Sequence, residues 1–336
     1  MKLAVVLFNL GGPDAPEAVE PFLCNLFNDP AILSVPSFIR KPLARFIAGR
    51  RAPIAREIYA KIGGRSPILE ETQAQARALE KALSEYQTRA FIAMRCWKPF
   101  SDETAREVAA WSPDRIVLLP LYPQFSTTTS QSSLMDWRRA ASAAGITAPR
   151  SQICCYPRSR GFIEALAGLT RETMAKMRPD ISYRVLLSAH GLPERVIARG
   201  DPYRWQVEQT AAALVEQLGI VDWTVCYQSR VGPLKWIGPA TDAEIRRAGA
   251  DGKGVLVVPV SFVSEHSETL VELDMDYGKL AREAGVHDYL RVPTVSTRPE
   301  FILGLAQLVR QSLAQPVTGG GRLCPAPRGL CFYGRE

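Results

Sequence analysis

Residues 185–203 read VLLSAHGLPERVIARGDPY and contain one of only three histidines in this chain of 336 residues. The apolar run predicts a buried strand, and His190 stands at its end, directly before the turn sequence GLP. In open α/β sheets, ligands bind at the carboxyl ends of the strands. A single histidine at a strand end is often only a hydrogen-bonded structural residue, but the tight turn after His190 favours a role in handling protons.

Outward from this stretch, apolar runs alternate with amphipathic segments along the chain. Strands are expected at residues 2–8, 90–94, 115–119, 183–188, 223–227 and 254–260. Helices are expected at residues 70–84, 102–111, 161–176, 204–218, 242–248 and 299–314. This alternation predicts an α/β fold with parallel sheets flanked by helices.

The two halves of the chain resemble each other, because three sequence matches occur in the same order. The matched pairs are AVVLFNLGGP (4–13) with RVLLSAHGLP (184–193), PFSD (99–102) with PATD (239–242), and RIVLLPL (115–121) with GVLVVPV (254–260). One interpretation is that βα units look alike by chance. The other is two similar lobes that face each other across a cleft. The lobes are then expected at residues 1–150 and 151–315, with a flexible tail at 316–336.

The first half is longer than the second by about 40 residues, which places an insertion at about residues 20–66. Eight basic residues and a single acid lie between positions 40 and 65, and this excess accounts for the net charge of +7. Such a patch favours anions, and no nucleic-acid motif accompanies it. The insertion predicts either a lip over the cleft, with peripheral contact to anionic membrane through residues 30–65, or an extra helical hairpin packed on the core.

A run of acids follows the last apolar strand. Glu265, Glu268, Glu272 and Asp276 lie at positions i, i+3, i+7 and i+11, which share one face of a helix. Like charges on one face repel each other, so the run is costly unless protons or cations are handled there. His266 and Glu268 also have the side chains of metal ligands. The alternative is an ordinary solvated acidic face.

Other classes of protein are excluded by what the sequence lacks. No apolar run reaches the ~18 residues of a membrane span, and the N-terminus reads as a first strand and turn. Seven cysteines without a disulfide framework predict a reducing compartment, hence the cytoplasm. Neither a dinucleotide-binding motif nor a P-loop occurs.

Several of these motifs together resemble the ferrochelatase family, whose members insert ferrous iron into a porphyrin. The resemblance covers residues 2–314 and rests on four stretches: IGGRSPI (62–68), LLSAHGLPERVIARGDPY (186–203), QSRVGP (228–233) and FVSEHSETL (262–270). It implies two similar Rossmann-like lobes, and an enzyme of the last step of haem biosynthesis with protoporphyrin IX and Fe²⁺ as substrates. The cysteine usage and the apolar and basic insertion together predict a cytoplasmic protein that is peripheral at the inner membrane face.

The resemblance also implies roles for individual residues. His190 accepts protons from the pyrrole nitrogens, Glu268 lies opposite it, and both contact the metal. Further acidic and histidine side chains form a path for metal or protons: His266, Glu265, Glu272 and Asp276. The residues implied to bind the porphyrin are Arg51, Tyr59, Ser66, Arg95, Trp236, Phe262 and Leu10.

Two departures from the family matter. Leu10 stands where some relatives carry Tyr or Met near the metal, so no ligand is expected there, and protoporphyrin is favoured over coproporphyrin. Animal relatives bind a 2Fe–2S cluster through several tail cysteines, whereas this tail has only Cys324 and Cys331, which counts against a cluster without excluding it. The alternatives are a coproporphyrin ferrochelatase and a non-catalytic porphyrin- or haem-binding protein.

Overall fold

The computed structural model describes residues 1–230, 232–314 and 323–325. The chain forms two compact units, and within the described residues each unit contains a four-stranded parallel sheet. Unit 1 comprises Met1–Cys155 and Leu305–Leu323, and unit 2 comprises Tyr156–Gly304 and Cys324–Glu336. The unit boundary thus falls inside α11 (Pro299–Ala314). The sequence predicted that all of this helix belongs to the second lobe, but its last turns group with unit 1.

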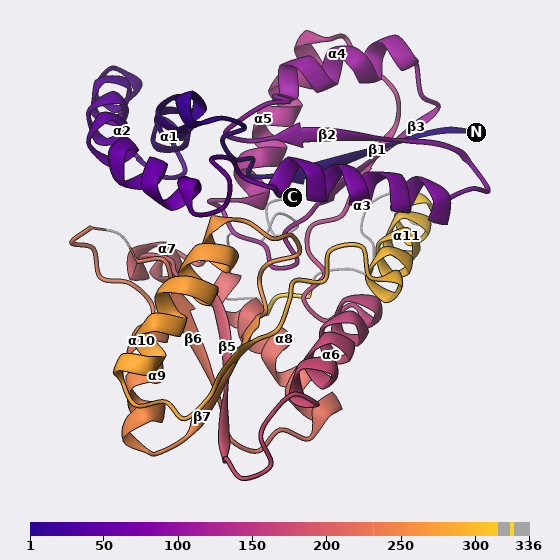
Figure 1. Ribbon diagram of the computed structural model, residues 1–336. Helices are drawn as coiled ribbons and strands as arrows, with labels where there is room; N and C mark the ends of the chain where they lie inside the picture. Colours follow the sequence, from indigo (N-terminus) through magenta and orange to yellow (C-terminus); the bar gives the residue numbers. More distant parts are fainter. Residues whose placement is uncertain (231, 315–322, 326–336) are drawn as a thin grey trace. The chain divides into compact units, whose positions relative to one another are not determined.

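The sheet of unit 1 has the strand order β2-β1-β3-β4. Its strands are β1 (Lys2–Asn9), β2 (Gln87–Met94), β3 (Arg115–Pro120) and β4 (Arg150–Gln152). Helices α4 (Ser101–Trp111) and α5 (Ser130–Ala143) cover one face, where Phe8 packs edge-on against Trp137. Figure 1 shows α3 (Ile68–Ala82) on the opposite side of β1 from α4. Because both faces are covered, β1 is a continuous apolar run.

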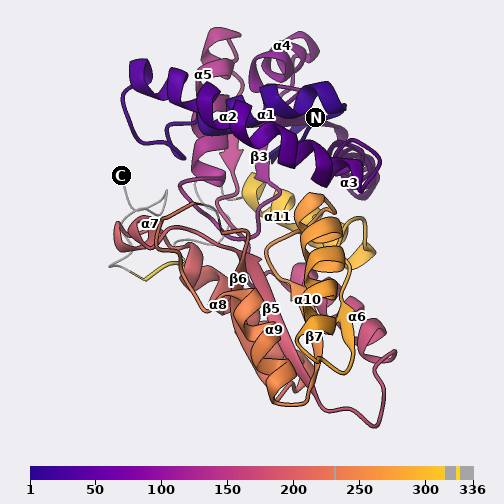
Figure 2. The same cartoon turned by 60° about the vertical axis from the view of Figure 1, so that its left-hand side comes forward.

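The sheet of unit 2 has the order β6-β5-β7-β8. Its strands are β5 (Tyr183–His190), β6 (Trp223–Gln228), β7 (Gly254–Pro259) and β8 (Tyr289–Arg291). Helices α9 (Thr241–Ala250) and α10 (Tyr277–Glu283) pack on one face of the sheet. Helices α6 (Arg160–Met174) and α8 (Tyr203–Leu218) lie away from that pair, on the other side of β5 (Figures 1 and 2). The short helix α7 (Glu194–Ala198) follows the turn after β5.

The predicted likeness of the two halves is confirmed, because β1 and β5 occupy the same place in identical strand orders. Equivalent hydrogen bonds also recur after the third strand of each unit, since Leu121 N donates to Phe8 O and Val260 N donates to Ser188 O. All six predicted strands exist. The edge strands β4 and β8 were missed because three residues are too few to show a pattern.

The insertion forms a pair of helices, α1 (Val19–Phe27) and α2 (Ser37–Ala60), preceded by one 3₁₀ turn at Pro16–Ala18. They lie side by side in Figure 1 and share a small apolar core, so the insertion is a packed helical hairpin. The opposite surface of α2 is not covered by the described residues, because Phe38 is 76 % exposed and Ile54 is 63 % exposed. In the described part of the chain, no helix is both long and apolar enough to cross a membrane.

Candidate functional site

The last residue of β5 carries the predicted catalytic imidazole. His190 Nδ1 lies 2.9 Å from Glu268 Oε2, and the two side chains are 37 % and 30 % exposed. An ionised carboxylate can only accept a hydrogen bond, so Nδ1 donates and the lone pair of a neutral imidazole stands on Nε2. The arrangement leaves His190 one nitrogen able to take a proton, with a carboxylate behind it to stabilise the resulting charge.

The contact between these two residues corrects one prediction. The sequence placed Glu268 opposite His190, on the other face of the porphyrin. A flat macrocycle in van der Waals contact on both faces needs roughly twice the 3.5–4.0 Å separation of a single atomic contact. The hydrogen bond of 2.9 Å leaves no such space. His190 and Glu268 therefore lie side by side as a hydrogen-bonded pair, and their roles stay predictions.

Most of the acidic run lies on a π-helix, Glu268–Asp276, and not on the α-helix that the sequence indicated. Hydrogen bonds in a π-helix reach from residue i to i+5, and such segments are rare and concentrated at functional sites. Glu268, Glu272 and Asp276, spaced by four residues, lie along it. Glu265 precedes the helix and does not join this face, because its carboxylate instead accepts from Arg291 at 2.6 Å and from Thr294 N at 2.9 Å.

Two residues at the end of β6 hold the middle of this π-helix. Gln228 Nε2 donates to Glu268 O at 3.1 Å and to Glu272 Oε2 at 3.2 Å. Ser229, at a left-handed φ of 61°, donates to Glu272 through both its backbone N–H and its hydroxyl. A non-glycine residue at such a φ is uncommon and marks a site that its surroundings must hold in place. Sequence reasoning gave these two residues no role, although they end the strand beside His190.

Charge and burial push the two π-helical glutamates in opposite directions. Burial alone would raise the pKa of Glu268, but the positive charge of His190 and its hydrogen bond hold that pKa well below the ordinary value. Burial and the charge of Glu268 together raise the pKa of Glu272, against the opposing hydrogen bonds from Ser229. The π-helix thus carries one firmly ionised carboxylate, Glu268, and one that holds a proton more readily, Glu272.

The same contacts act on the imidazole. Burial would lower the pKa of His190, but the negative charge of Glu268 outweighs it and raises that pKa. At Glu265, burial would raise the carboxyl pKa and the charge of Arg291 lowers it instead. Glu265 is therefore held as a structural anion, paired with a buried cation.

Aromatic side chains border the His190 cluster in unit 2. The ring of Phe262 lies 4.7 Å from that of His266, whose Nε2 is 3.7 Å from Glu268 Oε2. Trp236 lies against the turn after β5, since a Cβ atom added to Gly191 would stand 3.3 Å from Trp236 Cε3. His190, Glu268, His266 and Phe262 are thus brought together, and Trp236 lies at the neighbouring turn.

Three of the predicted porphyrin-binding residues of unit 1 gather around the turn after β1. Leu10 packs, partly buried, on the apolar cluster that contains Tyr59. Ser66 N donates to Pro13 O at 2.8 Å, and a Cβ atom on Gly12 would meet Ser66 Cβ at 2.5 Å. Glycine is thus required at position 12 for the close approach of this loop. Arg51, by contrast, is exposed on α2.

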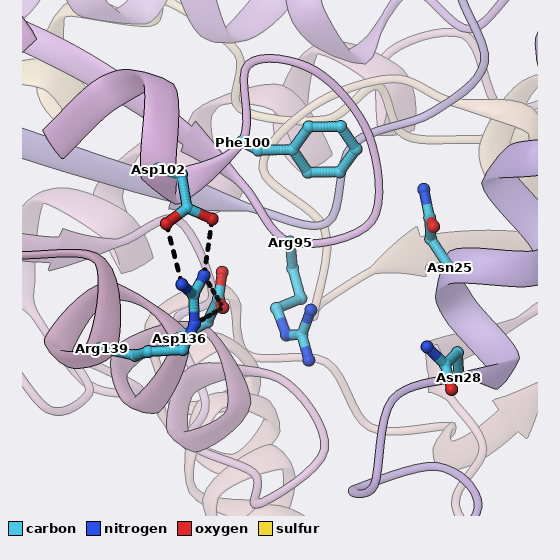
Figure 3. A pocket seen from close by; sticks show the side chains of 7 residues that line it. All are labelled: Asn25, Asn28, Arg95, Phe100, Asp102, Asp136 and Arg139. Atoms are coloured by element: carbon cyan, nitrogen blue, oxygen red, sulfur yellow. Dashed lines mark hydrogen bonds and ion pairs between the residues drawn. The ribbon is translucent and has the colours of Figure 1, made fainter. Parts of the chain in front are cut away.

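Arg95, just after β2, is part of a polar pocket of about 180 Å³ (Figure 3). Its Nε donates to Ser132 Oγ at 2.7 Å, and its terminal nitrogen lies 3.0 Å from the buried Asp29 carboxylate. Other residues line the pocket: Asn25, Asn28, Phe100, Asp102, Asp136 and Arg139. Figure 3 shows Arg139 held between Asp102 and Asp136, on the other side of Arg95 from the two asparagines. Arg95 is therefore fixed by neighbours from α5 and from the loop after α1.

Metal ligands are sparse in the described residues, where no group of three or more His, Cys, Asp or Glu side chains is placed to hold a metal ion. His190 and Glu268 already bond each other through Nδ1 and Oε2, so His190 Nε2 is the nitrogen of the imidazole that could still contact a metal. In the tail, Cys324 is buried, and its Sγ accepts from Gln206 Nε2 at 3.2 Å. Cys331 lies outside the described residues.

Comparison with known structures identifies the class of fold. SirB from Bacillus subtilis, solved with Fe³⁺, is similar with a TM-score of 0.56 at 14 % identity, over 94 % of this chain and 97 % of that one. A sirohydrochlorin chelatase SirB structure from Bacillus subtilis subspecies spizizenii, in complex with cobalt, gives a TM-score of 0.54 at 13 % identity, over 94 % and 97 %. The two parallel-sheet units form the chelatase fold.

Comparison of sequences is more specific. The ferrochelatase family model matches residues 2–313. Ferrochelatase of Caulobacter vibrioides is 57 % identical over 94 % of this chain and 91 % of that protein. Ferrochelatase of Phenylobacterium zucineum is 55 % identical over 98 % of each. The chain belongs to the ferrochelatase family. The predicted activity, insertion of ferrous iron into a porphyrin at the last step of haem biosynthesis, is thereby confirmed, while the roles of single residues stay predictions.

Proposed function

We propose that this ferrochelatase inserts Fe²⁺ into protoporphyrin IX, with the His190–Glu268 pair as its proton acceptor. The observation that carries the proposal is the hydrogen bond from His190 Nδ1 to Glu268, which leaves Nε2 free. Metal insertion requires the loss of two pyrrole protons. A neutral imidazole takes the first proton at Nε2, and the adjacent carboxylate stabilises the imidazolium that forms. Once that proton has passed on to solvent through the acidic side chains, the neutral imidazole is restored and takes the second proton.

Glu272 is the proposed next carrier of a proton. The carboxylate of Glu272 accepts from Gln228 Nε2, which also donates to the backbone carbonyl of Glu268 and so holds Glu272 near the start of the π-helix. The raised pKa of Glu272 suits a group that alternates between the protonated and ionised forms. Protons that reach His190 can leave along Glu268, Glu272 and Asp276. His266 lies beside the start of this path.

The proposed porphyrin-binding residues have two kinds of chemistry. Arg51, Tyr59 and Ser66 offer a guanidinium and two hydroxyls, which suit the propionate groups of a porphyrin. Leu10, Trp236 and Phe262 offer apolar and aromatic surface for the macrocycle. Arg95 is the remaining proposed porphyrin-binding residue, and Asp29 holds its guanidinium in place. Because Leu10 cannot ligate iron, the metal receives no ligand from that position, and we propose protoporphyrin over coproporphyrin as substrate.

The test is anaerobic mixing of the protein with Fe²⁺ and each of the two porphyrins, followed by porphyrin absorbance. The proposal expects catalytic conversion of protoporphyrin IX, with a higher kcat/KM than for coproporphyrin. Faster turnover of coproporphyrin would make the protein a coproporphyrin ferrochelatase. Tight binding without turnover of either porphyrin would identify a binding protein instead.

We also propose that α2 contacts the surface of an anionic membrane. Its exposed apolar residues are Phe38, Ile39, Leu43, Phe46 and Ile54. They are interleaved with six arginines and lysines against a single acid, Glu57, and Arg50 stacks over the ring of Phe46 at 5.5 Å. A helix with exposed aromatic residues among basic ones binds anionic lipid by combining apolar insertion with charge attraction.

Liposome flotation tests this proposal. Binding to vesicles with anionic lipid is expected, with loss at high salt and in the double variant Phe38→Ser/Phe46→Ser. The matched control is Val221→Ser, which removes an apolar residue that is 94 % exposed but outside α2. If the double variant binds as well as the wild type, or if neutral vesicles serve equally, α2 is not an electrostatic membrane contact.

A further inference from the structure

The edge strand β8 reaches the π-helix with two side chains. Tyr289 OH donates to Leu273 O, in the middle of the π-helix, at 2.6 Å. Arg291 Nε donates to Asp274 Oδ1 at 2.8 Å, and its NH1 group donates to Glu265 Oε1 at 2.6 Å. Arg291 is only 10 % exposed, and its ion pair with Glu265 is shielded from water, whereas Asp274 is 36 % exposed. One short strand thus holds the helix and the loop that leads into it.

A π-helix needs such support, because its hydrogen-bond geometry is less favourable than that of an α-helix. If Glu268–Asp276 relaxed to an α-helix, fewer residues would make each turn, and Glu272 would rotate around the axis relative to Glu268. Gln228 could then no longer bond both residues. The relative placement of the acidic side chains therefore depends on what keeps the segment π-helical.

The contacts of the π-helix come from two directions. From β6, Gln228 and Ser229 bond the acidic side chains themselves. From β8, Tyr289 bonds a backbone carbonyl and Arg291 bonds Asp274, neither of which belongs to the acidic face. The contacts from β8 consequently set the backbone without touching the groups that carry protons.

We propose that Tyr289 and Arg291 are positioning residues, which hold residues 268–276 in the π-helical register that keeps Glu268 against His190 and Glu272 against Gln228. This inference rests on the proposed function of the acidic side chains. Arg291 also ties Glu265 to the same strand, so it fixes the start of the loop that carries His266. No other residue in the described part of the chain forms ion pairs to both Glu265 and Asp274.

The chain offers a matched control in the same sheet. Arg184, at the start of β5, also forks to two carboxylates, those of Asp222 and Asp251, at 2.9 and 2.8 Å. Its side chain is 11 % exposed, close to the 10 % of Arg291. It has no hydrogen bond or ion pair to the π-helix among the described residues. Loss of Arg184 therefore removes a similar ion network with no change at the acidic side chains.

The experiment compares Arg291→Met, Arg291→Lys, Tyr289→Phe and Arg184→Met. For each variant, kcat, KM for Fe²⁺ and KM for protoporphyrin IX are measured separately, together with Tm and the hydrogen exchange of amides 268–276. Arg291→Met is expected to lower kcat/KM for Fe²⁺ by about 10-fold or more, the usual effect of losing a support behind a functional group, with KM for porphyrin unchanged. Arg291→Lys should recover part of the loss, and Tyr289→Phe should show a smaller one.

Hydrogen exchange tests the positioning role independently of catalysis. Amides 268–276 should exchange faster in Arg291→Met than in Arg184→Met, even where the two variants have the same Tm. If Arg291→Met and Arg184→Met change kinetics, Tm and exchange alike, Arg291 is merely structural and the inference is wrong. An equal rise of KM for iron and porphyrin would also overturn it.

A fifth variant, Glu272→Gln, separates failure of this inference from failure of the proposed function. If Glu272→Gln leaves the iron kinetics unchanged, the acidic path is wrong, and the exchange measurement alone then decides whether β8 holds the π-helix. If Glu272→Gln impairs the iron kinetics and Arg291→Met does not, the path stands and the positioning role fails.

Discussion

The two units share one scaffold but differ in what stands at the strand ends. By the offsets that relate the halves, Leu10 after β1 corresponds to His190 at the end of β5, and Ser133 corresponds to Glu272. In unit 1 these positions are apolar or hydroxyl-bearing, whereas in unit 2 they are ionisable and bonded into one network. The fold therefore supplies equivalent positions in both units, and the side chains placed there are the reason we propose proton handling in unit 2 alone.

The backbone differs at the same place. The segment after β3 continues into the regular helix α5, while its counterpart after β7 is the π-helix followed by α10. Leu273, on the π-helix, still packs into the core of unit 2, much as Leu134 on α5 packs into that of unit 1. The irregular helix thus keeps the packing of the scaffold and changes only the placement of polar side chains.

The largest effect is expected at the strand ends. His190→Ala removes the proposed proton acceptor and should lower kcat by about 10²–10⁴-fold, the usual contribution of a general base. The counterpart Leu10→Ala, which removes apolar surface proposed to contact the macrocycle, should raise KM for porphyrin and lower kcat far less than His190→Ala. Initial rates of iron insertion and porphyrin binding by fluorescence check both variants. Equal losses of kcat in the two variants would contradict the proposal that the proton acceptor lies in unit 2 and not at the corresponding position of unit 1.

A smaller effect is expected at the second matched pair. Glu272→Gln keeps the size of the side chain but removes its ability to carry a proton, so kcat should fall by about 10-fold. Ser133→Ala, at the corresponding position of unit 1, should not change kcat. Steady-state rates at saturating porphyrin measure both, and a loss of kcat in Ser133→Ala alone would contradict the assignment.

The charge of the imidazole should follow Glu268. In Glu268→Gln the negative charge is lost and burial remains, so the pKa of His190 should fall. Its protonated form should then disappear at a lower pH than in the wild type. NMR titration can follow this, because the chain has only three histidines. An unchanged or raised pKa would mean that Glu268 does not set the charge of His190.

The smallest predicted effect concerns packing. Gly249 in α9 lies so close to the carbonyl oxygen of Ala284 that an added Cβ atom would overlap it. Gly249→Ala should lower the free energy of unfolding by about 1–3 kcal/mol. Its counterpart in α4 is Ala109, where Ala109→Gly should cost only about 0.5–1 kcal/mol. Chemical denaturation measures both, and a larger loss for Ala109→Gly would show that the helices are packed differently than described.

Much of the scaffold could be predicted from the sequence, because β1, β5 and β7 are buried on both faces and are mostly apolar along their length. The duplication was visible for the same reason. The π-helix was not, since Glu265, Glu268 and Glu272 also fit an α-helical face and only tertiary contacts decide the register. Those contacts come from Tyr289 and Arg291 on a strand of three residues.

The site was found in part. His190 was detectable because a polar residue that ends an apolar run is conspicuous. The same reasoning applied to the strand at 223–227 would have found Gln228 and Ser229. That Glu268 touches His190 directly could not be read from the sequence, because the two residues lie 78 positions apart and no spacing rule relates them.

We propose that His190 and Glu268 act together in catalysis, and a double-mutant cycle measures this coupling. kcat is measured for wild type, His190→Ala, Glu268→Gln and the double variant. Residues that act together are strongly non-additive, so the double variant should be about as slow as His190→Ala alone. Losses that multiply in the double variant would show that the two side chains work independently and would contradict the account.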